Sequence, residues 1–210
     1  MEEKELLSAC RRGDEAAFEA LVRLHEKRVY ALCRRMCRNG EDALEAAQDT
    51  FLAVWRGLDS FREDAAFSTW LYRLASNACL DLLRREKKRS ADVSLDDEEV
   101  RLDPADAAPR PDEAAEREET RRQVREALYA LPDDYRQILL LRESEQLSYA
   151  EIAAVTGLEL GTVKSRINRA RLALRNDLAA SGNFFASAPS KPGKETTRKT
   201  PRGGKEAERA

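Results

Sequence analysis

The segment from Leu147 to Arg175 constrains the fold more than any other part of this chain. Its pattern predicts two short helices joined by a tight turn. Ser148, with Glu151 three residues later, forms a capping box for the first helix, and Gly157, which tolerates a positive φ, ends that helix. An apolar stripe on the second helix is expected at Val163, Ile167 and Leu174, with Thr162 as its N-cap.

The outward face of the second helix is strongly basic. Between Thr162 and Arg175 there are five basic residues and no acidic one. This arrangement predicts a helix-turn-helix, whose second helix enters the major groove of DNA, where Arg and Lys can donate to guanine and Asn can pair with adenine. The alternative is an amphipathic hairpin with a solvated basic face. The outward residues are Lys164, Ser165, Arg166, Asn168, Arg169, Arg171 and Arg175.

Composition supports an all-α fold made of small helical domains. Of the 210 residues, 36% are charged and only 6% are aromatic, and few stretches alternate as strands do. The net charge of −2 does not by itself indicate a nucleic-acid binder. We find no apolar stretch long enough to span a membrane and no signal peptide at the charged start, so a cytoplasmic protein is expected.

The chain divides into four parts. Residues 1–90 are predicted to form a helical domain, with a helix starting after the N-cap Asp14, another running through Val29 to a stop near Gly40, and further helices at about 41–57 and 67–88. Residues 91–116 hold ten acidic and two basic residues and three prolines, so they are expected to be an unpacked acidic linker. Residues 117–180 are the second helical domain, and residues 181–210 are a basic tail expected to be disordered.

A second group of residues combines aromatic and basic side chains between Phe61 and Arg85. Bases of single-stranded nucleic acid stack on rings while positive charge follows the backbone, and this segment offers both features. The alternative is that the rings form a small hydrophobic centre, which the helical spacing of Trp70, Leu71 and Leu74 favours.

The helix expected at Glu41–Trp55 has an acidic face, with Leu44, Phe51, Leu52 and Val54 available to pack inward. Such a face suggests a basic protein partner instead of DNA, although a merely solvated surface is the alternative.

Enzymatic chemistry is not expected. Cys33 and Cys37 could share a helix face as a redox pair or half a metal site, but no Cys/His cluster accompanies them, and ordinary packing is the simpler interpretation. The single histidine, His25, is expected on a helix surface. No nucleophile–base pair, phosphate-binding loop, cofactor or metal site is predicted.

Together these segments resemble the extracytoplasmic-function (ECF, group 4) sigma factors of the sigma-70 family. EDALEAAQDTFLAVW is similar to the helix that grips the clamp of RNA polymerase, and FREDAAFSTWLYRLASNACLDLLRR to the region that melts and reads the −10 element. LPDDYRQILLLRESEQLSYAEIAAVTGLELGTVKSRINRAR is similar to the region that binds the −35 element. The resemblance covers about residues 14–90 and 117–178.

The resemblance implies two helical domains, a sigma region 2-like four-helix domain and a sigma region 4-like helix-turn-helix domain, joined by the acidic linker. It implies core RNA polymerase and promoter DNA as partners, together with an anti-sigma factor. Polymerase contacts are implied for Asp42, Glu45, Gln48, Asp49 and Phe51. Contacts to the −10 element are implied for Phe61, Phe67, Trp70, Asn77, Arg84 and Arg85. At the −35 element, base contacts are implied for Lys164, Ser165, Asn168 and Arg169, and phosphate contacts for Arg166 and Arg171. Thr162 is also expected among the residues that bind this element.

The main alternative is a free-standing helix-turn-helix transcriptional regulator that binds duplex DNA without polymerase. The aromatic and basic segment, the acidic face and the long acidic linker all weigh against it. A thiol-dependent enzyme is a more remote alternative.

Overall fold

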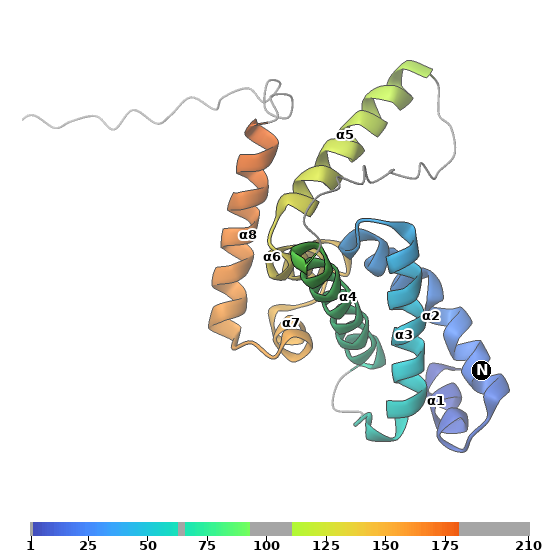
Figure 1. The fold of residues 1–210 in the computed structure, drawn as a ribbon. Helices are drawn as coiled ribbons and strands as arrows, with labels where there is room; N and C mark the ends of the chain where they lie inside the picture. The colour runs from blue at the N-terminus through green and yellow to red at the C-terminus, as the bar shows by residue number, and fades with distance from the viewer. Residues whose placement is uncertain (1, 63–65, 93–110, 181–210) are drawn as a thin grey trace, which may run out of the picture.

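The computed structural model describes residues 2–62, 66–92 and 111–180, and over these residues the chain is all-α, as predicted (Figure 1). The greater part of the expected acidic linker, residues 93–110, and the expected basic tail, residues 181–210, lie outside the described residues. None of the described helices is both long enough and apolar enough to cross a bilayer.

Four helices make up the N-terminal half of the molecule. Each of α2 and α3 begins at a side-chain cap: Asp14 accepts from the Ala17 amide at 3.0 Å, and Asn39 accepts from the Asp42 amide at 2.7 Å. Helix α4 packs against both of them, and α1 covers α2. The helices are α1 (Glu3–Arg11), α2 (Glu15–Met36), α3 (Gly40–Gly57) and α4 (Phe67–Asp92), with a 3₁₀ turn, η1 (Leu58–Ser60), after α3.

Two predictions about this half were wrong. The two helices expected between Asp14 and Gly40 are one continuous helix, α2, because no breaking residue interrupts the segment. Gly40 was expected to stop a helix, but it is the first residue of α3, since Asn39 immediately before it supplies the cap.

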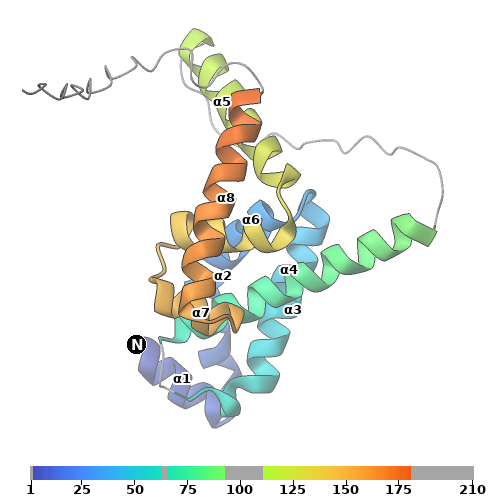
Figure 2. The ribbon, with the colours of Figure 1, turned by 90° about the vertical axis from the view of Figure 1, so that its left-hand side faces the viewer.

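The remaining helices form the C-terminal half, in which α8 crosses α5, α6 and α7 (Figure 2). Helix α5 begins at Pro111, inside the expected linker; proline suits the first turn of a helix, where its missing N–H has no partner to lose. The elements are α5 (Pro111–Ala130), α6 (Asp133–Leu139), a π-helical turn η2 (Leu140–Ser144), α7 (Tyr149–Thr156) and α8 (Leu160–Ala180).

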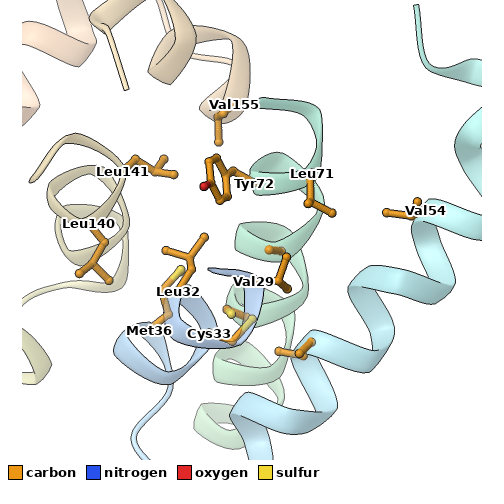
Figure 3. Packing of buried hydrophobic residues seen from close by; sticks show 14 of the residues in the cluster. Val29, Leu32, Cys33, Met36, Val54, Leu71, Tyr72, Leu140, Leu141 and Val155 are labelled. Atoms are coloured by element: carbon orange, nitrogen blue, oxygen red, sulfur yellow. The ribbon is translucent and has the colours of Figure 1, made fainter. Parts of the chain in front are cut away.

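One apolar core runs through both halves. Figure 3 shows its centre, where the ring of Tyr72 from α4 lies between Leu32 of α2 and, from the C-terminal half, Leu141 and Val155. Leu32 and Leu141 are fully buried, and Tyr72 is only 2% exposed. The C-terminal half is therefore packed on α2 and α4 by apolar contact.

A buried guanidinium, that of Arg136, adds polar contacts at the same junction. Within the C-terminal half it donates to the carbonyl oxygens of Leu128, Tyr129 and Leu131 at 3.1–3.3 Å and to the Asp133 carboxylate at 3.1 Å. Across the junction its Nη1 donates to the carbonyl oxygen of Met36 at 2.5 Å. One side chain thus satisfies acceptors in both halves.

Tyr129 reinforces this contact. Its hydroxyl donates to the carbonyl oxygen of Cys37 at 2.8 Å and lies 3.1 Å from that of Arg34, while the Arg136 guanidinium lies 5.4 Å from its ring centre. The last turn of a helix has carbonyl groups without intrahelical partners. Tyr129 and Arg136 supply partners for those at the end of α2.

A pair of carboxyl groups joins α3 to α4. Glu86 of α4 is hydrogen-bonded to Asp42 of α3, and burial, followed by this contact and the charge of Asp42, raises the pKa of Glu86 to about 7. Arg38 and Arg89 act in the opposite direction but do not cancel the effect. Near neutral pH a substantial fraction of the Glu86 carboxyl groups is therefore protonated.

We expect Arg136→Ala to lower the free energy of unfolding by about 3–5 kcal/mol, because several buried carbonyl oxygens and Asp133 lose their donor. Urea unfolding measures this loss. The matched control is Arg122→Ala on α5, which removes only exposed ion pairs to Glu119 and Glu126 and should cost less than about 1 kcal/mol. Equal losses in the two variants would contradict the role given to Arg136.

The raised pKa of Glu86 predicts a pH effect with a definite sign. The folded chain holds this proton more tightly than the unfolded chain does, so the stability contribution is present at low pH and is lost as pH rises from about 4.5 to about 7. The Glu86→Gln substitution removes the titrating carboxyl group, so this pH-dependent loss of stability does not occur in the variant. Relative to wild type, the variant should gain about 1 kcal/mol between pH 5 and pH 8, a figure reduced for solvent screening of a partly exposed group.

Urea unfolding at the two pH values, with Glu41→Gln as the control from the exposed side of α3, measures this difference. A stability difference between Glu86→Gln and wild type that stays constant with pH would rule the effect out.

Candidate nucleic-acid and polymerase interfaces

The predicted turn between the two short helices is present in atomic detail. The Ser148 hydroxyl accepts from the Glu151 amide at 3.2 Å, and the Glu151 carboxylate accepts from the Ser148 amide at 2.8 Å. Gly157 has φ 71° and donates its N–H to the carbonyl oxygen of Ala153 at 2.9 Å. The capping box and the terminating glycine were both predicted correctly.

The start of α8 differs from the prediction. Thr162 was expected to be the N-cap, but the helix begins at Leu160. The Val163 amide donates to the carbonyl oxygen of Glu159, four residues earlier, at 2.9 Å. Thr162 lies inside the first turn, where its carbonyl accepts from the Ser165 hydroxyl. Because the Glu159 carbonyl already accepts this helical hydrogen bond, the Thr162 backbone lies within the helix and the residue cannot act as the cap.

Helix α8 has one buried face and one exposed face. Val163, Ile167 and Ala170 are fully buried, whereas Leu174 is only half-buried. The opposite face carries hydrogen-bond donors on the exposed side chains of Lys164, Ser165, Asn168 and Arg169. These are the four positions for which the family resemblance implied base contacts.

Two further basic residues of α8 are engaged in ion pairs. Arg166 lies 2.9 Å from the Asp134 carboxylate, and Arg171 donates through Nε and Nη2 to Glu143 at 3.0 and 2.6 Å. These pairs hold α8 against α6 and η2. The acidic partners are about 30 residues away in sequence, so no local pattern could have identified them.

The aromatic residues of the second segment pack on one another. Phe61 and Phe67 are buried, and Trp70 is half-buried. Their ring centres are separated by 5.2–5.8 Å, and the His25 ring lies 5.2 Å from that of Phe67. Most of their surface is therefore directed to the core of the N-terminal half.

The polar members of that segment are exposed along α4. Asn77 is exposed, Arg84 pairs with Asp81 at 2.7 Å, and Arg85 lies 3.9 Å from Glu45 on α3. Weak surface pairs of this kind exchange readily for other anions. The exposed side of α4 thus offers an amide and two guanidinium groups.

His25 was expected on the surface, and this was wrong. Its side chain is 8% exposed, and its Nε2 lies 2.9 Å from the Glu3 carboxylate of α1. Burial lowers the pKa of the His25 imidazole, with Glu3 acting in the opposite direction. The helix α1 covers this part of α2, which a periodicity argument on α2 alone could not reveal.

The face of α3 that was expected to be acidic is also apolar. Glu45, Gln48 and Asp49 are exposed, Asp42 and Phe51 are half-buried, and Asp42 accepts from the Asn39 side-chain amide at 2.8 Å. Val54 packs inward as expected, but Leu44 and Leu52 do not: they are 52% and 49% exposed.

Trp55, which is 42% exposed, extends this apolar surface. We call the exposed residues Leu44, Leu52 and Trp55 the α3 stripe. Beside Trp55 lies an open groove between α2 and α3. The groove is lined by Glu15, Phe18, Val22, Gln48, Phe51, Leu52 and Trp55.

The cysteines are packing residues in this fold. Cys33, Cys37 and Cys79 are fully buried, and the thiol of Cys79 is hydrogen-bonded to the other two, which together with burial raises the pKa of Cys79. A thiol with a raised pKa is a poor nucleophile and metal ligand. Among the described residues, no group of three or more His, Cys, Asp or Glu side chains is arranged to hold a metal ion.

Comparison with known proteins identifies relatives of both halves. The sigma-70 region 2 family model matches residues 21–89, and the sigma-70 region 4 model matches residues 121–174. The RNA polymerase sigma-H factor of Pseudomonas aeruginosa is 36% identical over 82% of this chain and 92% of its own. The ECF RNA polymerase sigma factor SigW of Bacillus subtilis is 34% identical over 83% and 96%.

Solved structures agree with these relatives. CnrH, in complex with the cytosolic domain of CnrY, matches with a TM-score of 0.62 and 30% identity over 85% of this chain and 97% of its own. The sigma factor RpoE of Bartonella quintana, in complex with the anti-sigma factor NepR, matches with a TM-score of 0.60 and 27% identity over 77% and 96%. With both sigma regions present in order and the curated relatives covered almost end to end, this chain belongs to the ECF RNA polymerase sigma factors.

Proposed function

We propose that this sigma factor directs core RNA polymerase to promoters through three surfaces: the exposed face of α8, the exposed side of α4 and the α3 stripe with its acidic neighbours. It carries out no covalent chemistry itself. The observation that supports the assignment most strongly is the face of α8, where exposed donors at Lys164, Ser165, Asn168 and Arg169 stand on a fully buried apolar backing.

The α8 face is the proposed reader of the −35 element. Arg169 and Lys164 can donate to guanine, and Asn168 can pair with adenine in the major groove. Arg166 and Arg171 would hold phosphates by exchanging their present carboxylate partners, Asp134 and Glu143, for the DNA backbone. Thr162 is exposed in the first turn of α8 and would contact the DNA backbone.

The exposed side of α4 is the proposed reader of the −10 element. Asn77 would contact an unpaired base, and Arg84 and Arg85 would follow the phosphates of the single strand. Since Phe61 and Phe67 are buried, we assign them the role of fixing the start of α4, with half-buried Trp70 nearest to the surface. Capturing unpaired bases makes binding energy available for strand opening.

The α3 face is the proposed contact with core polymerase. Glu45, Gln48 and Asp49 offer charge and hydrogen bonds, and the α3 stripe offers apolar area, next to Asp42 and Phe51. A polar rim around apolar anchors is the usual anatomy of a protein interface. The complementary partner is a helical, partly basic surface of the polymerase clamp.

We further infer that an anti-sigma factor regulates this chain and that the chain acts in the bacterial cytoplasm. The matched CnrH and RpoE structures are complexes with the cytosolic domain of CnrY and with the anti-sigma factor NepR, respectively. The polymerase and chromosome with which a sigma factor works lie in the cytoplasm.

Run-off transcription with sigma-free core polymerase on templates with randomised upstream sequences tests the proposal. We expect specific initiation from templates that share two spaced elements. Tight binding of duplex DNA by the chain alone, with no initiation, would instead identify a free-standing regulator.

Arg169→Ala should weaken promoter binding by about 1–3 kcal/mol and relax specificity at a single position of the −35 element, because a base contact is lost. Holoenzyme binding to a set of single-base promoter variants measures both effects. The matched control is Arg175→Ala, at an exposed position six residues later on α8, and this variant should lose affinity uniformly across sequences. A uniform loss for Arg169→Ala would reassign that residue to a phosphate.

Leu52→Ala should weaken binding to core polymerase by about 1–2 kcal/mol, as expected for truncation of an apolar anchor in an interface, and should leave folding intact because the side chain is exposed. Titration of labelled core polymerase gives the Kd. Leu24→Ala on α2 is the control, since Leu24 is 53% exposed, close to the 49% of Leu52, and does not line the groove. The same Kd change in both variants would refute a specific role for the α3 stripe.

A further inference from the structure

A cavity of about 800 Å³ lies between α2 and α5. Its volume falls within the range of roughly 300–1,000 Å³ that is typical of small-molecule sites. Leu128 of α5 and Leu140 of η2 give it an apolar lining, and Tyr30 of α2 adds an aromatic ring from a residue that is 40% exposed. The residues that we assign to DNA and to core polymerase all lie outside this cavity, so the proposed function does not account for it.

Four guanidinium groups line the cavity. Arg34 and Arg35 come from α2, and Arg121 and Arg125 come from α5. Among the described residues that line it there is no Asp or Glu. Like charges gathered in one concavity repel one another, which does not favour folding, but they raise the local concentration of anions. The charge of the cavity is therefore explained better by an anionic ligand than by the needs of the fold.

The nearest carboxylates leave much of this charge available. Glu118 lies 3.6 Å from Nη1 of Arg121 and 4.0 Å from Nη2 of Arg125. Glu145 lies 3.5 Å from Nη1 of Arg35. All three separations exceed the roughly 2.7–3.2 Å of a good hydrogen bond, so these arginines keep donors for a closer acceptor. Two carboxylates also do not neutralise four guanidinium groups.

The two walls of the cavity are held in a fixed relation to each other. The Tyr129 hydroxyl, on α5, donates to the carbonyl oxygen of Cys37 at 2.8 Å and lies 3.1 Å from the carbonyl oxygen of Arg34. Helix α5 is thus bonded to the turn of α2 that carries two of the four arginines. A site that is already formed loses less conformational freedom when it binds a ligand.

We propose that this cavity binds a nucleoside polyphosphate. Guanidinium groups donate paired hydrogen bonds to phosphate oxygens, and arginines on two facing walls suit a chain of phosphate groups better than a single small anion. The Tyr30 ring and the apolar side chains of Val124 and Leu128 line the same space and suit a flat base, which stacks on such rings. The site would add a small-molecule ligand to a chain whose proposed partners are all macromolecules.

Calorimetric titration of the full chain with ATP and with GTP tests this assignment without polymerase or DNA, so its outcome does not depend on the proposed function. We expect one nucleotide to bind per chain. Tripolyphosphate, which lacks the nucleoside, should bind more weakly, and adenosine, which lacks the phosphates, should give no heat of binding. The site would be refuted by a lack of binding at millimolar ATP and GTP, and the nucleoside by equal affinities for ATP and tripolyphosphate.

Arg34→Gln and Arg125→Gln each remove one guanidinium group, from opposite walls. Each should weaken ATP binding roughly tenfold to a hundredfold, the range for a lost hydrogen bond to a charged group. The matched control is Arg122→Gln, which should leave the Kd unchanged because Arg122 lies on α5 outside the cavity and pairs with Glu119. Equal weakening in all three variants would show attraction to surface charge alone and would overturn the site.

Circular dichroism establishes that each variant is folded. If Arg125→Gln does not fold, Arg121→Gln removes a guanidinium group from the same wall, at a side chain that is 65% exposed.

Tyr30→Leu separates recognition of the base from recognition of the phosphates. It should weaken ATP binding about tenfold, as expected for the loss of one stacked base, and leave tripolyphosphate binding unchanged. An unchanged affinity for ATP would overturn the nucleoside assignment. A short single-stranded DNA that displaces ATP, and that loses affinity in the same arginine variants, would overturn the proposal by assigning the cavity to a nucleic-acid backbone.

Discussion

The arrangement of the two halves depends on the carbonyl groups that end α2. A helix of 22 residues leaves acceptors at its C-terminus that cannot be satisfied within the helix. In this molecule Arg136 and Tyr129 supply the donors, at 2.5 Å to Met36 and 2.8 Å to Cys37. Because Arg136 also closes the turn between α5 and α6, the internal structure of the C-terminal half and its position on α2 are linked through one side chain. Apolar packing around Tyr72 then fills the space beside it (Figure 3).

Local signals explain what could be predicted from the sequence. The capping box at Ser148, the positive φ at Gly157 and the alternating buried and exposed faces of α8 depend on residues within a few positions of each other. Helix α2 shows the limit, since neither capping nor periodicity distinguishes one long helix from two. Gly40 was mistaken for a stop because glycine also suits a first turn when a good cap, Asn39, precedes it.

Features that depend on contacts between distant segments could not be predicted from local sequence patterns. The burial of His25 comes from α1, and the carboxylate partners of Arg166 and Arg171 come from α6 and η2. The exposure of Leu44 and Leu52 has a different origin, since apolar residues on a helix are normally expected to face the core. Here they extend an acidic surface, and a surface that combines both properties is consistent with a partner that covers it. For such positions, departure from the folding pattern is itself a sign of function.

The buried thiols of the N-terminal half have a practical consequence. Cys33, Cys37 and Cys79 are inaccessible while α2 and α4 remain packed, and the raised pKa of Cys79 keeps its thiol protonated. A thiol reagent can react with such groups only during the moments when the helices part, so the rate of modification follows the free energy of local opening. The three thiols therefore report how often the N-terminal half opens, and the order in which they are modified would show where that opening begins.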